Sequence, residues 1–394
     1  MKPVGIQAFA LSCALGKDKA SIWRNLSQAN RSHMLKDTHF LSGEATYIGK
    51  IQQNLPPLPP ALKHFDYRAN RLLLSVFTQI QTPYERLCQK YSADKIGIIL
   101  GTSTAGVDSL EHAINYYDQQ AQFPPSYQPH HQRMASVAEF LAQYLAVGGP
   151  VMSVSTACSS AAKAMIAAQR WLNEGLCDVV ITGGVDVLCE LTLKGFDALG
   201  ALSHKPCQPF SANRCGINIG EAAVLFVLSR ETADINLLGG GESSDAHHIS
   251  APDPQAKGAI AAMQNALNNS TLQANDIDYL NLHGTGTKQN DAMEALAVER
   301  VFSHAIPCSS TKALTGHTLG VAGALEIALS ALSMSEINST NDFIPHVFDG
   351  QIDEDISPIN LLKKGNQLGK PRTILSNSFA FGGSNAALII GRAC

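Results

Sequence analysis

The sequence lacks the features that would place it in several large classes of protein. It has no block of basic residues, and 29 lysines and arginines against 33 acidic residues give a formal net charge of −4, so we expect no nucleic-acid role. No run approaches the ~20 apolar residues that a membrane span needs. No Pro-, Ser- or Gly-rich linker divides the 394 residues, so any two halves are expected to pack intimately.

Cysteine pairing and targeting signals are lacking as well. The nine cysteines form no CxxC pair and have no regular spacing, so neither a zinc site nor a disulfide framework is expected. We interpret them as reduced thiols of a cytoplasmic protein. The apolar run from Val4 to Gly16 is interrupted by Gln7 and is followed by no small-residue cleavage site, which favours a buried first strand over a signal peptide.

Short aliphatic runs that end in Gly, Ser or Thr alternate with Ala-rich segments along the chain. Examples are Ile98 to Leu100, Val151 to Val154 and Val179 to Ile181, the last ending before Gly183-Gly184. Fully apolar strands that alternate with helices are typical of a sheet covered by helices on both faces. The sequence therefore predicts an α/β fold.

Two stretches share one pattern of strand, tight turn and Ala/Gly-rich helix. The first runs from Val151 through Cys158 into a helix over Ser159 to Leu172, and the second from Ile306 through Gly316-His317 into a helix over Gly320 to Leu332. The likeness predicts a duplicated architecture with a reactive group at the same place in each half. The expected halves are residues 1–240 and 241–394, and the small residues predict two centrally buried helices.

Cys158 lies at the start of a predicted helix, between Thr156-Ala157 and Ser159-Ser160. A thiol at a helix N-terminus feels the positive end of the helix dipole, so we expect a lowered pKa and a reactive thiolate. The alternative is a buried structural cysteine, as for most of the others.

Two histidines and one aromatic turn have settings that suit catalysis. His283 and His317 are each followed or preceded directly by glycine, which permits close approach of a ligand. Either histidine alone is more typical of a structural role, but the pair together with Cys158 favours catalysis. The Phe381-Gly382-Gly383 turn can place a backbone N–H at an oxyanion and a ring at the mouth of a pocket; the alternative is a plain β-hairpin.

Five motifs in order resemble those of the β-ketoacyl-ACP synthases I and II and their type II polyketide relatives, over nearly the whole chain. They are Thr156-Ala157-Cys158-Ser159-Ser160, His283-Gly284-Thr285-Gly286-Thr287, Lys312 followed by Gly316-His317, Glu326, and Phe381-Gly382-Gly383-Ser384-Asn385. The resemblance implies the thiolase fold, in which two similar halves form a layered αβαβα core, usually in a dimer.

The resemblance also implies roles for these residues. Cys158 would be the acyl-accepting nucleophile, and His283 and His317 would polarise the malonyl thioester carbonyl. Lys312 would hold the electrostatics of the histidine pair, and Glu326 would support the network. The implied reaction is the decarboxylative Claisen condensation of malonyl-ACP with the Cys-bound acyl chain, without a metal or redox cofactor.

Further positions match the family's substrate contacts. Thr285 and Thr287 match positions that contact phosphopantetheine, and Asp291 matches a structural acid. The backbone N–H groups of Cys158 and Phe381 would form the oxyanion hole, with Phe381 as the gate.

Acyl carrier protein is the implied partner. Carrier proteins are acidic, and Lys63, Arg68 and Arg71 form a basic cluster, with Lys205 and Arg214 as additions. The alternative is an ordinary solvated face.

Three departures from the family pattern refine this expectation. Ala380 stands where the family often has glycine, and Ser211 and Ala222 replace an acid and a glycine. With the short chain, these features are more similar to the ketosynthases of aryl-polyene clusters than to housekeeping fatty-acid synthases. The expected unit is a homodimer or a heterodimer with a ketosynthase-like chain-length factor.

Three other assignments fit the sequence less well. A non-catalytic chain-length factor replaces the nucleophile, whereas Cys158 is present here. A degradative thiolase needs a second cysteine in a Cys-x-Gly setting, which Cys394 lacks, and it does not explain His317 with Lys312. An initiating synthase pairs cysteine with histidine and asparagine, and the Gly316-His317 motif argues against it.

Overall fold

The structure is a computed structural model that describes residues 1–302, 305–366 and 369–393; Cys394 and its setting lie outside them. In the described part, a main sheet of eleven strands has the order β12-β11-β10-β13-β14-β9-β1-β8-β6-β4-β5, and a small sheet has the order β2-β3-β7. The strands are β1 (Val4–Cys13), β2 (Leu35–Asp37), β3 (Thr46–Gly49), β4 (Ile96–Gly101), β5 (Val151–Val154), β6 (Val179–Asp186), β7 (Ile219–Gly220), β8 (Ala222–Ser229), β9 (Ile235–Ser244), β10 (Tyr279–Asn281), β11 (Pro307–Ser309), β12 (Asn360–Leu361), β13 (Thr373–Phe379) and β14 (Ser384–Arg392).

The main sheet consists of two halves with the same connectivity. In the first half, β1, β8 and β6 are antiparallel neighbours, and β6, β4 and β5 run parallel. In the second half, β9, β14 and β13 are antiparallel, and β13, β10 and β11 run parallel. The halves join where Val4 and Gly5 of β1 pair with Leu237 and Asn236 of β9. This repeat confirms the expected α/β fold with duplicated halves.

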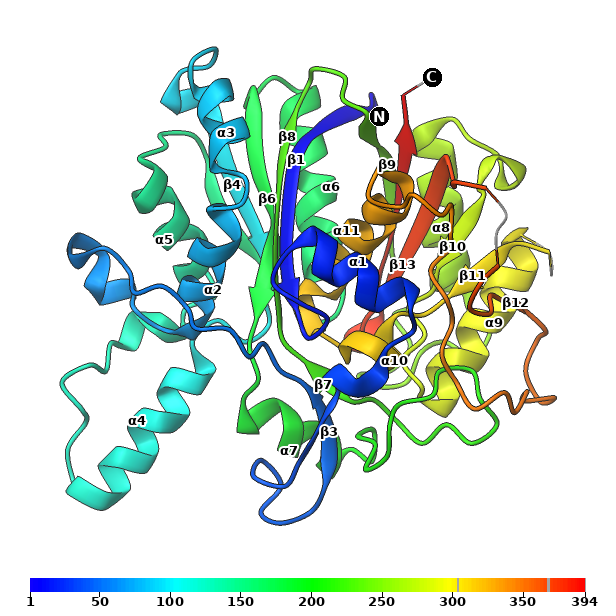
Figure 1. The fold of residues 1–394 in the computed structure, drawn as a ribbon, viewed down its shortest axis with the longest axis horizontal. Coiled ribbons are helices and arrows are strands. Elements are labelled where there is room, and N and C mark those ends of the chain that lie inside the picture. Colours follow the sequence, from blue (N-terminus) through cyan, green and yellow to red (C-terminus); the bar gives the residue numbers. More distant parts are fainter. Residues whose placement is uncertain (303–304, 367–368, 394) are drawn as a thin grey trace.

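Helices form three layers around the two half-sheets (Figure 1). Helices α2 and α5 cover the outer face of the first half, α8 and α9 lie outside the second, and α6 and α11 lie between the halves. The arrangement is a layered αβαβα core. The helices are α1 (Lys19–Ser27), α2 (Arg68–Phe77), α3 (Gln81–Cys88), α4 (Val107–Gln120), α5 (Ser136–Leu145), α6 (Ser160–Asn173), α7 (Glu190–Ala198), α8 (Lys257–Ser270), α9 (Lys288–Phe302), α10 (Lys312–Thr315) and α11 (Ala322–Met334).

The two central helices are buried because their small residues allow close packing. Every residue of α11 is buried, and a Cβ added at Gly323 would lie 2.9 Å from the Cβ of Ala162 on α6. Each half leads from a parallel strand into its central helix, so the turn after β5 carries Cys158 and the segment after β11 carries His317. The two turns therefore meet at the centre of the molecule.

The strand ends differ from expectation at β6. This strand continues through Gly183 and Gly184 instead of ending before them, because a Cβ at Gly184 would meet the carbonyl oxygen of Gly101 at 2.1 Å. The glycines thus permit close strand pairing. The expected division between residues 240 and 241 falls inside β9, the first strand of the second half, whereas the chain passes from one half-sheet to the other between β8 and β9.

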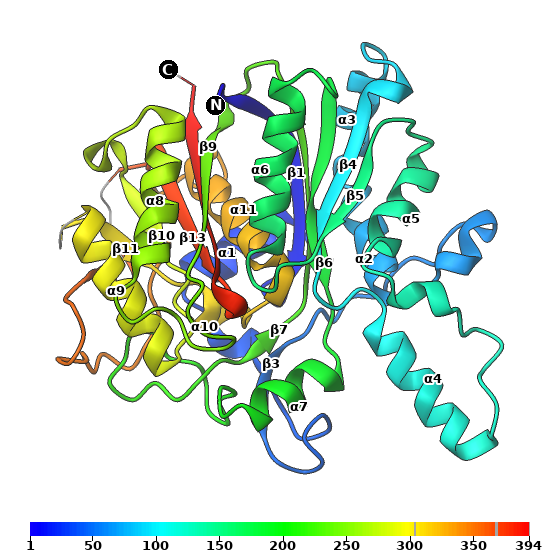
Figure 2. The same ribbon diagram turned by 180° about the vertical axis from the view of Figure 1, so that it is seen from behind.

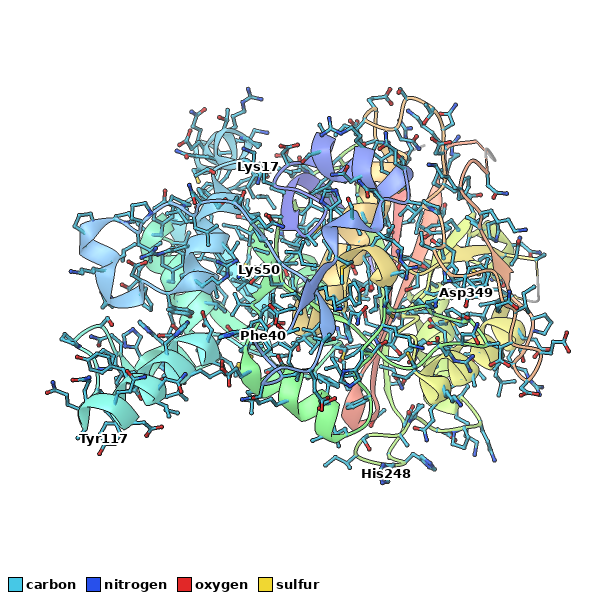
Figure 3. The ribbon with its side chains drawn as sticks, turned by 60° about the horizontal axis from the view of Figure 1, so that its bottom comes forward. Lys17, Phe40, Lys50, Tyr117, His248 and Asp349 are labelled. Atoms are coloured by element: carbon cyan, nitrogen blue, oxygen red, sulfur yellow. The ribbon has the colours of Figure 1, made fainter. Side chains whose placement is uncertain are left out.

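One side of the molecule carries a projecting helix and an open sheet edge. Helix α4 extends away from the body (Figure 2), and Tyr117 lies near its far end (Figure 3). Strand β5 is the last strand of the main sheet on this side, and the side chains of Val151 and Met152 are 39% and 50% exposed. Among the described residues, no helix combines the length and apolarity that crossing a bilayer requires.

Candidate active site

The turn that carries Cys158 is held by its own neighbours. Ala157 has a left-handed φ of 50°, which is uncommon for a residue with a Cβ. The hydroxyl of Ser160 accepts a hydrogen bond from the N–H of Thr156 and donates one to the carbonyl of Ala157. These bonds turn the chain sharply before α6 and place the buried Cys158 thiol just ahead of the helix N-terminus.

His317 lies directly beside the thiol. Gly316 before it has a φ of 70°, which glycine adopts without steric penalty. The Nε2 atom of His317 is 3.0 Å from the Sγ of Cys158. The N–H of Leu319 donates to Nδ1 at 3.3 Å, so this partner assigns the ring proton to Nε2.

His283 is positioned by a buried carboxylate on α9. The N–H groups of His283 and Gly284 each donate to one oxygen of Glu294, both at 2.7 Å. The imidazole of His283 meets that of His317 edge to face, with ring centroids 5.3 Å apart. Glu294 therefore fixes the backbone at His283, from which the imidazole of His283 contacts that of His317.

Lys312 and Glu326 form a buried ion pair behind the histidines. Their exposed fractions are 1% and 2%, and Nζ of Lys312 binds Oε1 of Glu326 and the carbonyl of His283. The same ammonium is 3.4 Å from Nδ1 of His283. Because an ammonium can only donate, Nδ1 accepts and Nε2 of His283 carries the proton.

The electrostatics keep both histidines neutral. Burial lowers the pKa of His283 well below its ordinary value, and the charge of Lys312 and the neighbouring His317 lower it further. Burial and then the charge of Lys312 lower the pKa of His317 in the same way. Two neutral imidazoles, each with a proton on Nε2, are suited to donate hydrogen bonds to a developing enolate oxygen.

The thiol of Cys158 differs from expectation. Burial raises its pKa to about 11, although the charge of Lys312 and the N–H groups of Phe381 and Cys158 itself lower it. Desolvation penalises the thiolate more strongly than the helix N-terminus stabilises it. The expectation of a lowered pKa was therefore wrong, because it took account of the helix and not of the depth of the site.

The catalytic groups line a cavity of about 720 Å³. Its walls include Thr285, Thr287 and Phe379, and the ring of Phe381 lies 5.6 Å from that of Phe196. The volume is in the range of pockets that bind small molecules. The structure thus brings Cys158 and both histidines together with the two threonines and the aromatic turn.

The aromatic turn is the tight end of the β13–β14 hairpin, so the hairpin and the cavity wall are one feature. Gly382 and Gly383 have φ values of 81° and 72°, which favour glycine. Ala380 has φ −104° and ψ 152°, extended values that alanine adopts without strain. The departure at Ala380 therefore leaves the backbone of this turn unstrained.

The basic cluster does not share one environment. Lys63 and Lys205 are exposed, and Arg71 pairs with Asp66. Arg68 forms two bonds with the buried carboxylate of Glu221 and lines a second cavity. Arg214 is buried and pairs with Asp353. A carrier-protein contact thus remains a prediction that suits the two exposed lysines better than the paired arginines.

Two buried acids were not identified as positioning residues from the sequence. Glu294 holds the His283 loop, and Asp186 accepts bonds from the N–H groups of Ser103, Thr104 and Val321. Asp291, expected as a structural acid, accepts from the N–H groups that follow His283. The residues next to Glu294 and Asp186 in the sequence give no sign of these long-range contacts. Asp291 could be identified because it matches a position in the family's pattern.

Two family profiles match consecutive parts of this chain. The profile described as "Beta-ketoacyl synthase, N-terminal domain" matches residues 1–233, and that described as "Beta-ketoacyl synthase, C-terminal domain" matches residues 236–340. Together they cover more than three quarters of the sequence.

Curated proteins and solved structures agree with these profiles. Nodulation protein E of Rhizobium meliloti (strain 1021) is 32% identical over 95% of this chain and 96% of its own length. The 3-oxoacyl-[acyl-carrier-protein] synthase 2 of Staphylococcus aureus is 31% identical over 76% of this chain and 77% of its own. A chain of the complex between the ketosynthase ApeO and its chain length factor ApeC from Xenorhabdus doucetiae is 39% identical, with a TM-score of 0.94, 100% of this chain and 98% of that chain covered.

Proposed function

This chain belongs to the β-ketoacyl synthase family and is an acyltransferase of the ketosynthase type, and we propose that Cys158, His283 and His317 carry its chemistry. It catalyses the decarboxylative condensation of malonyl-ACP with an acyl chain in fatty-acid or polyketide biosynthesis. The observation that carries the assignment of residues is the 3.0 Å approach of His317 Nε2 to Cys158 Sγ, with His283 beside them. These groups lie in one cavity.

In the first half-reaction, the thiolate of Cys158 attacks the acyl-ACP thioester. A new C–S bond forms, and the phosphopantetheine sulfur leaves and takes up a proton. The N–H groups of Phe381 and Cys158, which lower the thiol pKa, are proposed to donate to the carbonyl oxygen of the thioester as it develops charge. We assign the phosphopantetheine arm to the cavity wall that holds Thr285 and Thr287.

In the second half-reaction, the malonyl carboxylate leaves as carbon dioxide. The electron pair of the broken C–C bond forms an enolate whose oxygen accepts hydrogen bonds from the Nε2–H groups of His283 and His317. The enolate carbon attacks the acyl-Cys158 carbonyl, the C–S bond breaks, and the thiolate is released. Burial and, after it, the charge of Lys312 lower the pKa of both imidazoles and so keep them neutral.

The reaction is proposed to need no metal or redox cofactor. The ligand atoms of Cys158, His283 and His317 lie within 4.8 Å of one another, as metal ligands would. However, the partners of both Nδ1 atoms place a proton on each Nε2, which leaves no lone pair there for a metal ion. Hydrogen-bond donation is the chemistry that this geometry supports.

The partners are proposed to be acyl carrier protein and a second ketosynthase-like subunit in the cytoplasm. The solved structure that contains a chain 39% identical to this one is a complex of a ketosynthase with its chain length factor. Strand β5 is the last strand of the main sheet on its side, and its Val151 and Met152 are exposed. Tyr117 on helix α4 and Phe123 just after that helix are exposed as well. An unpaired edge beside apolar side chains favours pairing with another sheet. The departures at Ala380, Ser211 and Ala222 support an aryl-polyene pathway over housekeeping fatty-acid synthesis.

Intact-mass analysis after incubation with a panel of acyl-ACPs tests the proposal. Wild type and the Cys88→Ala variant, which removes an exposed thiol, are expected to gain one acyl group, and Cys158→Ala none. Loading of Cys158→Ala would overturn the assignment. For the partner, the chain expressed alone is expected to be poorly soluble or inactive, and co-expression with a ketosynthase-like chain-length factor is expected to restore a one-to-one complex. A fully active homodimer that extends saturated acyl-ACPs would favour the fatty-acid pathway.

A further inference from the structure

Two hydroxyl groups join the segment that carries Cys158 to the aromatic turn of the other half. The Oγ atom of Ser159, the residue after Cys158, lies 3.0 Å from the Oγ atom of Ser384. Ser159 is fully buried, and Ser384 is the first residue of β14, just after the turn that begins at Phe381. The chemistry proposed above gives neither hydroxyl a role, although both belong to motifs that indicated the site.

The protons of this contact can be assigned from the partners of Ser159. Its hydroxyl lies 2.8 Å from the carbonyl of Thr156 and 3.0 Å from the hydroxyl of the same residue. Because a carbonyl can only accept, Ser159 donates its one proton there. Its two lone pairs then accept from the hydroxyls of Thr156 and Ser384. The Ser384 hydroxyl is therefore the donor that crosses between the halves.

Backbone hydrogen bonds hold the aromatic turn within its own half. The N–H of Ala380 donates to the carbonyl of Ser384 at 2.9 Å, which closes the turn. The N–H of Gly382 donates to the carbonyl of Ile249, in the segment that follows β9. These bonds fix the shape of the turn, and the bond from Ser384 to Ser159 fixes its place relative to the nucleophile.

The place of the turn matters because the N–H of Phe381 acts on the nucleophile. Burial raises the pKa of Cys158 to about 11, whereas the charge of Lys312 and hydrogen bonds from the N–H groups of Phe381 and Cys158 itself lower it. These two N–H groups belong to different halves of the molecule. Hydrogen bonds weaken steeply as their geometry worsens, so a shift of about 1 Å between the halves would remove much of the contribution from Phe381.

We propose that Ser384 is a positioning residue whose hydrogen bond to Ser159 keeps the N–H of Phe381 aimed at the nucleophilic sulfur. During acyl transfer the same N–H donates to the thioester oxygen. The inference rests on the proposed function, because it assumes that Cys158 accepts the acyl chain. It adds a residue that acts on the first half-reaction and not on the second, in which the histidines bind the enolate.

Alkylation of Cys158 by iodoacetamide, followed by peptide mass spectrometry between pH 7 and pH 9, tests the contact without any substrate. Ser384→Ala is expected to react about tenfold more slowly than wild type, since only the thiolate reacts and a hydrogen bond to a charged group is worth about that factor. A turn that is merely loosened would expose the buried thiol and speed its alkylation. The sign of the change therefore separates a positioning role from a structural one.

Two further variants control this measurement. Ser384→Thr keeps the hydroxyl and is expected to react as wild type does. Ser244 is an exposed serine that pairs with Ser384 across β9 and β14, and Ser244→Ala is expected to leave the rate unchanged. Alkylation of Ser384→Ala at the wild-type rate or faster, or an equal loss in Ser244→Ala, would overturn the proposal.

A double-mutant cycle tests the pair itself. Ser159→Ala is expected to slow alkylation as Ser384→Ala does, and the double variant is expected to be no slower than the slower single variant, because both substitutions remove the same bond. A double variant in which the two effects multiply would show that the hydroxyls act separately and would refute the assigned contact.

Acyl loading from acyl-ACP then tests the role in catalysis. In Ser384→Ala, kcat for loading is expected to fall about tenfold while KM stays within about twofold, since the donor acts on charge that develops in the transition state. Release of carbon dioxide from malonyl-ACP is expected to change by less than about twofold. Equal losses in both half-reactions would overturn the proposal. Wild type that shows the alkylation pattern but loads no acyl group would refute the proposed function and not the positioning role.

Discussion

Replacing Lys312 by methionine is the sharpest test of the buried ion pair. Burial raises the pKa of Glu326 to about 7, and the charge and hydrogen bond of Lys312 lower it. Without the ammonium, a lone carboxylate at this depth would be very costly. The carboxyl group of Lys312→Met is therefore expected to stay protonated well above pH 7 in the folded protein.

The magnitude follows from proton linkage. In wild type, folded Glu326 binds more protons than the unfolded chain between pH 4.5 and about 7, so stability falls as pH rises through that window and levels off above it. In Lys312→Met the folded carboxyl stays protonated, so stability keeps falling by about 1.4 kcal/mol per pH unit above pH 7. The destabilisation by the substitution should thus be roughly 2.7 kcal/mol larger at pH 9 than at pH 7.

Urea unfolding at pH 7 and pH 9, at one fixed protein concentration, measures this difference. The double variant Lys312→Met/Glu326→Gln has no titrating carboxyl and is expected to follow the wild-type pH dependence above pH 7. If Lys312→Met loses the same free energy of unfolding at both pH values, the reasoning about the pair is refuted.

Three further outcomes are expected. His283→Ala and His317→Ala should still load acyl groups onto Cys158 but release no carbon dioxide from malonyl-ACP, because they act on the enolate; loss of loading in both would contradict their roles. Alkylation of Cys158 by iodoacetamide should rise about tenfold per pH unit towards pH 11, since only the thiolate reacts; a plateau below pH 8 would show that the thiol is activated. Charge reversal at Lys63 should raise the KM for carrier-protein substrates and weaken its salt dependence, and kinetics that do not change with ionic strength would remove Lys63 from the docking surface.

The motifs that predicted the site are those in which residues close in sequence position the functional side chain. The turn at Cys158 depends on hydrogen bonds between Thr156, Ala157 and Ser160, within five residues of sequence. The glycine before His317 permits a φ of 70°, a requirement that is visible in the sequence itself. Interactions of this range leave a readable pattern, so the candidate site could be placed before the fold was known.

Properties that depend on depth could not be read in the same way. The sequence placed Cys158 at a helix start, and the dipole argument predicted a lowered pKa. The structure shows that burial raises it to about 11, because desolvation depends on every layer that surrounds the thiol. Arg68 is a second case: the sequence shows only a basic neighbourhood, whereas its partner Glu221 lies 153 residues away.

By itself, the sequence determined the α/β class and the duplication, because apolar periodicity and turn chemistry are local, and its motifs named the candidate reactive residues. Tertiary structure decided which distant groups meet: Glu294 beneath His283, and Lys312 against Glu326. These contacts arise only when the two half-sheets enclose α6 and α11 and water is excluded between them. Exclusion of water shifts the pKa values of the buried groups and strengthens the interactions between their charges. No single stretch of sequence encodes this exclusion.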